Sequence, residues 1–208
     1  WFLCAMVWWL LALSMARHFP RLALAGSVII ALFTGAFPAV EYVPALDRAL
    51  YFLPWFIAGY TYGQSSLERA AGTSVGITVA LSVTSLFLAT ALWLAQTGPG
   101  WLYGSHGFAV LEVTLLHGIL MRALLMSIAL VMTWTLFAIV GRLGNVLSIA
   151  GKRSLAIYLL HGFLVLAITP TLGKLYDQYG AVVSIVTAGA ATGLIVYLLS
   201  LPLFDRGL

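Results

Sequence analysis

The chain has 208 residues, of which 62% are hydrophobic and only 8% are charged. A soluble domain carries about 25% charged residues, so this composition excludes a soluble protein and predicts several membrane-spanning helices. The net charge of +4 comes from cations scattered singly at the ends of apolar runs, which is not the pattern of a nucleic-acid-binding surface. The single cysteine, Cys4, excludes an internal disulfide.

Apolar segments follow one another along the whole chain, and their continuous runs indicate helices, because barrel strands would alternate apolar with polar residues. The segments lie at about 1–16, 22–40, 49–63, 73–95, 118–140, 151–169 and 181–203. We therefore predict an all-α bundle that crosses the membrane about seven times and forms one domain over residues 1–208. Because Trp1 already stands in a short apolar run, we expect the sequence to be truncated at its N-terminus, with further spans before it.

Several local features qualify this picture. Polar loops are expected at 64–71, 96–117 and 172–180. Pro54 is expected to kink the third segment or to mark its true start.

Two pairs of glycines at a spacing of four residues predict close approach of neighbouring helices. These pairs are Gly59 with Gly63 and Gly189 with Gly193.

The cations predict the orientation of the chain. Seven of the ten fall on one side of the predicted membrane: Arg17, Arg21, Arg69, Arg142, Lys152, Arg153 and Arg206. Cytoplasmic loops carry an excess of Lys and Arg, so this side is predicted to be cytoplasmic, together with the C-terminus. The loop at 96–117 then faces outward.

Residues 151–169 form the segment with the most informative polar pattern. At about 100° per residue, Ser154, Tyr158 and His161 fall within about 60° of one another on one helix face. A polar stripe on an otherwise apolar helix is expected to face the bundle interior or a water-filled cavity.

Four stretches together resemble the C-terminal part of the acyltransferase-3 family, and within it the fucose 4-O-acetylase-like branch. They are YFLPWFIAGYTYG (51–63), WLYGS (101–105), an arginine one turn into the next span (Arg122), and GKRSLAIYLLH (151–161). The resemblance implies an integral membrane enzyme that moves acyl groups, usually acetyl, from cytoplasmic acyl-CoA to sugars of surface polysaccharides or glycolipids. It also implies that the catalytic histidine lies upstream of Trp1, so that this piece alone is inactive.

On this resemblance, His161, Tyr158, Ser154 and Arg122 are expected to line the substrate site. For His161 the alternative is a structural hydrogen bond to a neighbouring helix. For Arg122 we weigh two interpretations equally: snorkelling to the headgroups, or a buried cation that holds a substrate or a carboxylate such as that of Glu112.

Cations at the predicted cytoplasmic ends of helices suit the phosphates of CoA, although topology anchoring is the better explanation of them. These residues are Lys152, Arg153 and Arg142. No metal site is expected, because the spacing of His106, Glu112 and His117 fits no zinc pattern. No bound cofactor is expected, since acyl-CoA is the donor substrate.

The sequence thus predicts a multi-pass protein of the inner (plasma) membrane whose partners are the lipid bilayer, acyl-CoA and a carbohydrate or lipid-linked glycan. No nucleic-acid partner is expected. The alternative is a transporter or flippase of a lipid-linked sugar, which would use the same polar stripe to line a path. A structural membrane subunit would leave that stripe unexplained.

Overall fold

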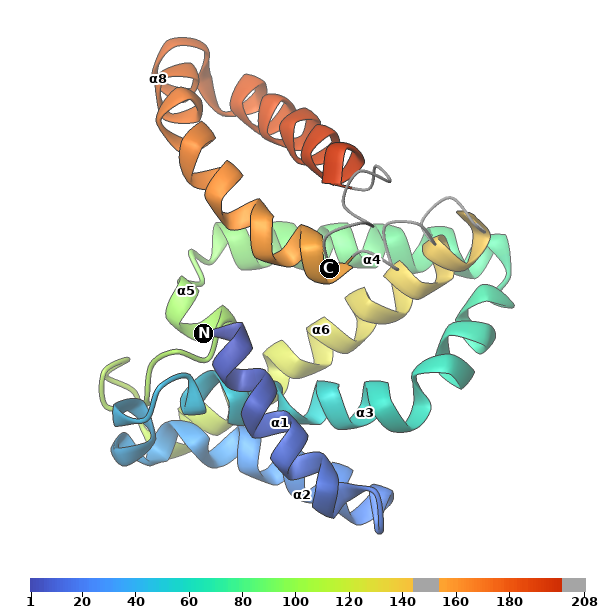
Figure 1. Cartoon of the computed structure of the whole chain (residues 1–208), viewed down its shortest axis with the longest axis vertical. Helices are drawn as coiled ribbons and strands as arrows, with labels where there is room; N and C mark the ends of the chain where they lie inside the picture. The colour runs from blue at the N-terminus through green and yellow to red at the C-terminus, as the bar shows by residue number, and fades with distance from the viewer. Residues whose placement is uncertain (144–153, 200–208) are drawn as a thin grey trace. The chain divides into compact units, whose positions relative to one another are not determined.

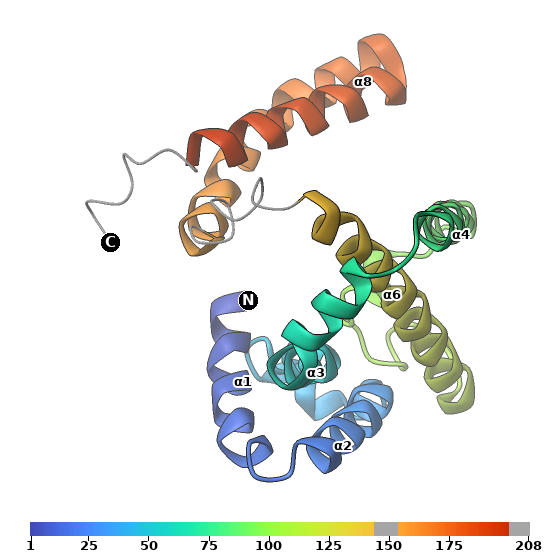
Figure 2. The same cartoon turned by 90° about the vertical axis from the view of Figure 1, so that its right-hand side faces the viewer.

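The computed structural model describes residues 1–143 and 154–199, except that the side chains of residues 154–164 and a few others are not described. Within these ranges every regular element is a helix and no strand occurs, which confirms the all-α prediction (Figures 1 and 2). The chain divides into two compact units, Trp1–Arg142 and Leu143–Leu208, and each is described by itself. The prediction of a single domain over 1–208 stays a prediction.

The first unit is built around three packed helices, α1 (Phe2–Ala16), α2 (Pro20–Phe33) and α3 (Leu46–Ala71). Two short 3₁₀ helices, η1 (Thr34–Ala36) and η2 (Pro38–Tyr42), connect α2 to α3. The core shared by α1, α2 and α3 is apolar. Its buried residues are Ala5, Trp9, Ala16, Ala49, Leu53 and Ile57. The indole N–H of Trp9 donates to the carbonyl oxygen of Ala49 at 2.8 Å, so a polar atom of this core is satisfied by the backbone of the neighbouring helix.

Helix α3 differs from the prediction at both ends. It begins at Leu46, so Pro54 lies inside it and does not mark its start. It also continues to Ala71 through the stretch 64–71, where a loop was expected, and that expectation is wrong. The polar residues there support the helix at a spacing of four, because the Gln64 amide donates to the Glu68 carboxylate at 3.1 Å.

Two further helices of this unit are long and apolar enough to cross a membrane, judged by length and composition over the described residues. They are α4 (Val75–Leu94) and residues 115–142 of α6 (Leu115–Leu143). Shorter apolar helical stretches occur at Phe2–Ser14, Pro20–Ala36 and Val182–Ile195. The count of seven spans stays a prediction.

Helix α4 meets α6 through hydroxyl groups. The hydroxyls of Ser85 and Thr135 lie 2.9 Å apart, and Thr135 also bonds the carbonyl oxygen of Leu81 at 3.4 Å. Small polar residues of this kind hold helices together in membranes, where apolar contact alone gives little preference for protein over lipid. Large apolar side chains of α4, including Phe87 and Trp93, are exposed.

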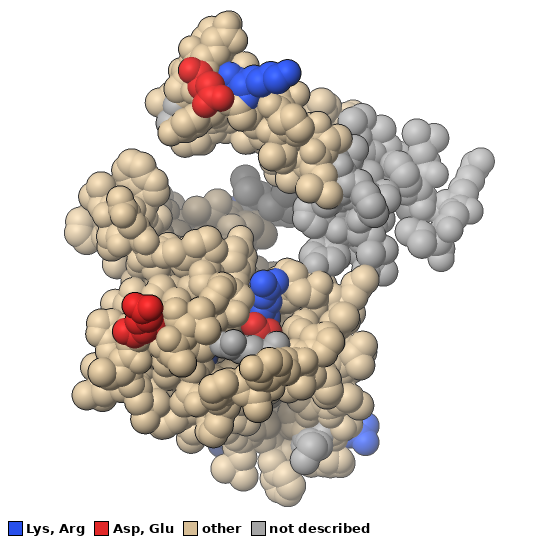
Figure 3. Space-filling view, turned by 90° about the vertical axis from the view of Figure 1, so that its left-hand side faces the viewer, with Lys and Arg blue, Asp and Glu red and all other residues tan. Residues whose placement is uncertain are grey.

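The surface carries few charges. Figure 3 shows one face of the molecule, on which charged side chains form separate spots on an otherwise uncharged surface. Large apolar side chains are widely exposed, which suits contact with lipid and not with water.

Over the residues of the second unit that the structure describes, 154–199, the chain forms the helical element α8 (Ser154–Leu199), whose two arms meet at Gly180 (Figure 1). Gly180 has φ 81° and ψ −179°, a backbone conformation that glycine adopts without the steric cost of a side chain. The loop expected at 172–180 is therefore wrong, because the helix continues and the break is confined to the glycine.

The glycine pairs do not act as predicted. A Cβ atom placed on Gly59, Gly63, Gly189 or Gly193 would meet no described atom within 4 Å. Within its own unit, each of these glycines therefore has no described helix in close contact. A helix comes close instead at Gly141, against Ala71, whereas Gly35, Gly100, Gly104 and Gly118 face the side chains of Phe108, His106 and Tyr51.

Candidate functional site

Arg122 is the most deeply buried charged residue of the described chain, with 2% of its surface exposed. Its guanidinium donates to the carbonyl oxygen of Ala31 at 2.9 Å and to that of His106 at 3.3 Å. A snorkelling arginine would place its charge at the surface, so that interpretation is wrong and Arg122 is buried. Its expected contact with a substrate stays a prediction.

Two aromatic rings flank this cation. The guanidinium carbon lies 4.9 Å from the centre of the Phe108 ring and 5.2 Å from that of Tyr51. A desolvated cation–π contact contributes about 2 kcal/mol, and Tyr51 and Phe108 are 4% exposed each. The positive charge is therefore stabilised by ring faces and backbone carbonyls.

No carboxylate lies within ion-pair distance of Arg122 in the described part of the chain. Asp47 interacts with it electrostatically from farther away. Glu112 is exposed and adopts φ 54°, so the alternative in which Arg122 holds the Glu112 carboxylate is wrong. The positive charge of Arg122 is therefore stabilised by two backbone carbonyl dipoles and two ring faces rather than by a carboxylate in contact with it.

The segment 104–114, which connects α5 (Pro99–Leu102) to α6, folds around Phe108. The Phe108 amide donates to the carbonyl oxygen of Gly35 at 2.7 Å, and its own carbonyl accepts from the Val113 amide at 3.1 Å. A Cβ on Gly35 would lie 2.6 Å from the Phe108 ring, and one on Gly118 would lie 2.5 Å from it. The two glycines thus make room for one ring between η1 and α6.

Gly104 begins this segment with φ +59°, and a Cβ there would overlap the Tyr51 ring. Glycine is required on both counts, because the left-handed region is unfavourable for other residues and the ring leaves no space. The side chain of His106 is exposed, and its Nδ1 atom lies 3.0 Å from the Ser105 hydroxyl. The backbone of His106 therefore faces Arg122 while its imidazole is accessible.

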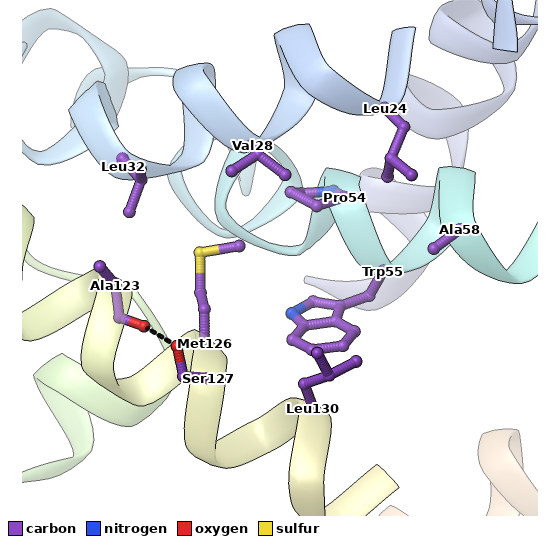
Figure 4. A pocket seen from close by; sticks show the side chains of 10 residues that line it. All are labelled: Leu24, Val28, Leu32, Pro54, Trp55, Ala58, Ala123, Met126, Ser127 and Leu130. Atoms are coloured by element: carbon purple, nitrogen blue, oxygen red, sulfur yellow. Dashed lines mark hydrogen bonds between the residues drawn. The ribbon is translucent and has the colours of Figure 1, made fainter. Parts of the chain in front are cut away.

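An apolar cavity of about 390 Å³ lies between α2, α3 and α6 (Figure 4). It is lined by Leu24, Val28, Leu32, Pro54, Trp55, Ala58, Ala123, Met126, Ser127 and Leu130. Two side chains of this lining carry polar groups, the Ser127 hydroxyl and the indole N–H of Trp55 (Figure 4). The hydroxyl donates to the carbonyl oxygen of Ala123 on its own helix at 2.8 Å, so the indole N–H is the donor that this mostly apolar cavity offers a ligand.

Arg142 connects the end of α6 to the turn between α3 and α4. Its guanidinium donates to the carbonyl oxygens of Ala138, at 2.6 Å, and of Thr73. A Cβ on Gly141 would lie 2.5 Å from that of Ala71, so the helices are also in close contact here. Two of the five guanidinium N–H groups serve these bonds, and the side chain remains exposed.

The remaining predicted site residues lie outside what the structure describes. Lys152 and Arg153 fall in the undescribed stretch 144–153. Ser154, Tyr158 and His161 belong to the first turns of α8, but their side chains are not described. Their roles stay predictions.

Sequence reasoning selected Arg122 but missed the residues around it. Tyr51 and Phe108 were assigned no role, and Gly35, Gly104 and Gly118 were passed over in favour of glycines at helical spacing. The available signal was the pair Gly104 and Gly107 just before Phe108, which indicates a turn at this point but not which ring packs against it.

Comparison with known proteins gives one family. The family model described as an acyltransferase domain, acyltransferase-3, matches residues 1–201. The match extends over both compact units. No curated protein and no solved structure matches the chain.

Proposed function

The chain belongs to the acyltransferase-3 family and is a membrane acyltransferase, and from this we propose that it transfers an acetyl group from cytoplasmic acetyl-CoA to a sugar hydroxyl. The acceptor is a surface polysaccharide or a glycolipid. The observation that supports this proposal is the family match over residues 1–201, together with the apolar helices long enough to cross a membrane. The protein is proposed to reside in the plasma membrane, with its C-terminus in the cytoplasm.

The chemistry of O-acetylation requires a base for the acceptor hydroxyl and donors for the oxyanion that forms at the thioester carbonyl. We assign the donor role to Ser154, Tyr158 and His161, whose positions on α8 fall on one helix face. None of the three is assigned the role of base.

The donor substrate also requires cations, because CoA carries several phosphate charges. Arg142, Lys152 and Arg153 are proposed to bind these phosphates. Arg142 is exposed, and three of its N–H groups are not engaged by the two backbone bonds described above. It can therefore stabilise a helix end and bind a phosphate in the same conformation.

The test replaces His161 with alanine in the full-length protein and measures acetyl groups on surface glycan by mass spectrometry. Loss of one oxyanion donor is expected to lower the rate by about 100-fold. The matched control is His18→Ala, which removes an exposed imidazole in the turn before α2. Normal acetylation by a well-expressed His161→Ala variant would remove His161 from the site.

A second measurement separates a transferase from a flippase. Purified full-length protein is expected to bind acetyl-CoA and to release free CoA only when a glycan acceptor is present. A protein that moves a lipid-linked sugar across the bilayer without consuming acetyl-CoA would contradict the proposed activity.

A further inference from the structure

Four parts of the chain meet at Arg122. The end of α2 provides the Ala31 carbonyl, α3 provides the Tyr51 ring, and the segment 104–114 provides both the His106 carbonyl and the Phe108 ring. Arg122 itself comes from α6. Only 2% of the surface of Arg122 is exposed to solvent, and its guanidinium contacts the protein's own backbone and rings.

We propose that Arg122 is a positioning residue for acyl transfer, which holds the segment 104–114 in the shape that receives the acyl acceptor. This inference rests on the proposed function, because only that function gives the segment an acceptor to receive. The segment lies on the side that the distribution of cations predicts to be opposite to the CoA phosphates.

The geometry explains why an arginine is needed. Arg122 contacts the segment at two points two residues apart, one hydrogen bond to the His106 carbonyl and one ring face at Phe108. These two contacts fix both the path and the rotation of the segment. Arginine can make them together because its planar group donates in its plane and stacks above and below it, whereas a lysine ammonium does neither in a fixed geometry.

The same contacts determine which side chains the segment presents. With the His106 carbonyl turned toward Arg122, its imidazole is exposed and bonded to the Ser105 hydroxyl. Tyr103 precedes the segment and is 54% exposed. Aromatic rings next to hydrogen-bonding groups suit a sugar, which presents both C–H faces and hydroxyls.

The first measurement reports the shape of the segment. A cysteine placed at the exposed position 109 (Ala109→Cys), in a Cys4→Ser background, is labelled with a membrane-impermeant maleimide in the full-length protein. Arg122→Ala is expected to raise the labelling rate about tenfold, because loss of a charged hydrogen bond increases the population of open conformations by that order. Arg122→Lys is expected to give an intermediate rate.

The second measurement separates positioning from general stability. At equal amounts of folded protein, Arg122→Lys is expected to raise KM for the glycan acceptor by about tenfold, while KM for acetyl-CoA changes by less than about twofold. A purely structural role would lower the amount of folded protein and leave both KM values unchanged.

Two variants keep the inference testable. Phe108→Leu keeps most of the apolar volume but removes the ring face, so it is expected to raise the labelling rate even where Arg122→Ala fails to fold. Arg48→Ala is the matched control, because Arg48 lies 5.2 Å from the Trp1 ring and makes a cation–π contact away from the segment. Its labelling rate is expected to equal that of the wild type.

The outcomes separate the inference from the proposed function. An unchanged labelling rate in both Arg122→Ala and Phe108→Leu, in an enzyme that acetylates glycan, would overturn the inference alone. Parallel rises in the two KM values would also overturn it. A wild-type protein that transfers no acetyl group would overturn the proposed function and the acceptor role of the segment 104–114. The labelling rates would still show whether Arg122 holds this segment in its observed shape.

Discussion

The Phe108 ring and Gly118 lie so close that a single added methyl group on the glycine would stand 2.5 Å from a ring carbon. The centre of the Phe108 ring lies 4.9 Å from the guanidinium carbon of Arg122. Arg122 follows Gly118 by one turn of helix α6. The backbone of α6 therefore forms one wall of the space that holds the ring, and its arginine forms another.

Gly118→Ala is predicted to destabilise the protein by about 1–3 kcal/mol, because the added methyl group forces the ring off its position. The control is Gly59→Ala, at a helical glycine with open space around it, which is predicted to stabilise by about 0.5–1 kcal/mol. Thermal unfolding in detergent measures both changes. Shifts of the same sign and size would contradict the packing described here.

Trp9→Phe is predicted to destabilise the protein by about 1–2 kcal/mol, because it removes the buried hydrogen bond that the Trp9 indole donates to the Ala49 carbonyl. The neighbouring Trp8 provides the comparison, since it is 38% exposed and its bond to the Pro44 carbonyl is long, at 3.4 Å. Trp8→Phe is expected to change stability by less than about 0.5 kcal/mol. Equal effects on the unfolding temperature would contradict the burial of Trp9.

The hydroxyl contact between α4 and α6 is predicted to give a coupling energy of about 0.6 kcal/mol in a double-mutant cycle of Ser85→Ala and Thr135→Val. Unfolding free energies of the two single variants and the double variant supply the value. As a control, Ser85→Ala combined with Ser127→Ala is expected to be additive, since Ser127 bonds only its own helix. A similar coupling energy in the control cycle would show that any pair of substitutions in α4 and α6 is coupled, and would contradict a specific contact between Ser85 and Thr135.

A reporter fused after Leu208 is predicted to lie in the cytoplasm, because most cations fall on that side of the predicted spans. A second reporter inserted between Ala109 and Val110, which are both exposed, is predicted to lie outside. Enzymatic reporters active in only one compartment measure both. Reporters found in the same compartment would overturn the orientation and with it the placement of the acceptor.

The helical class and the positions of α1, α4 and α6 could be predicted from the sequence, because apolar runs of that length have no other stable form in a membrane. The extension of α3 to Ala71 was missed, since hydropathy marks where a helix is apolar and not where it ends. The break at Gly180 was expected to be a longer loop, because Lys174 and Asp177 look like loop residues although both stand on a continuing helix.

The site was predictable only in part. Arg122 was identified because a lone cation near the start of an apolar run needs a reason. Its partners were not, because two of them are backbone carbonyls and two are aromatic rings. Every residue has a backbone carbonyl, so the residue types at positions 31 and 106 do not reveal that these carbonyls accept hydrogen bonds from Arg122.

Because Arg122 bonds main-chain carbonyls, its hold on the segment 104–114 does not depend on which side chain stands at position 106. A substitution at position 106 that leaves the local backbone path unchanged preserves the oxygen that Arg122 holds, whatever side chain replaces the imidazole. Under the proposed function, related enzymes could therefore exchange the side chains of the segment 104–114 to suit different acceptors, while keeping the same arginine and the same backbone contacts.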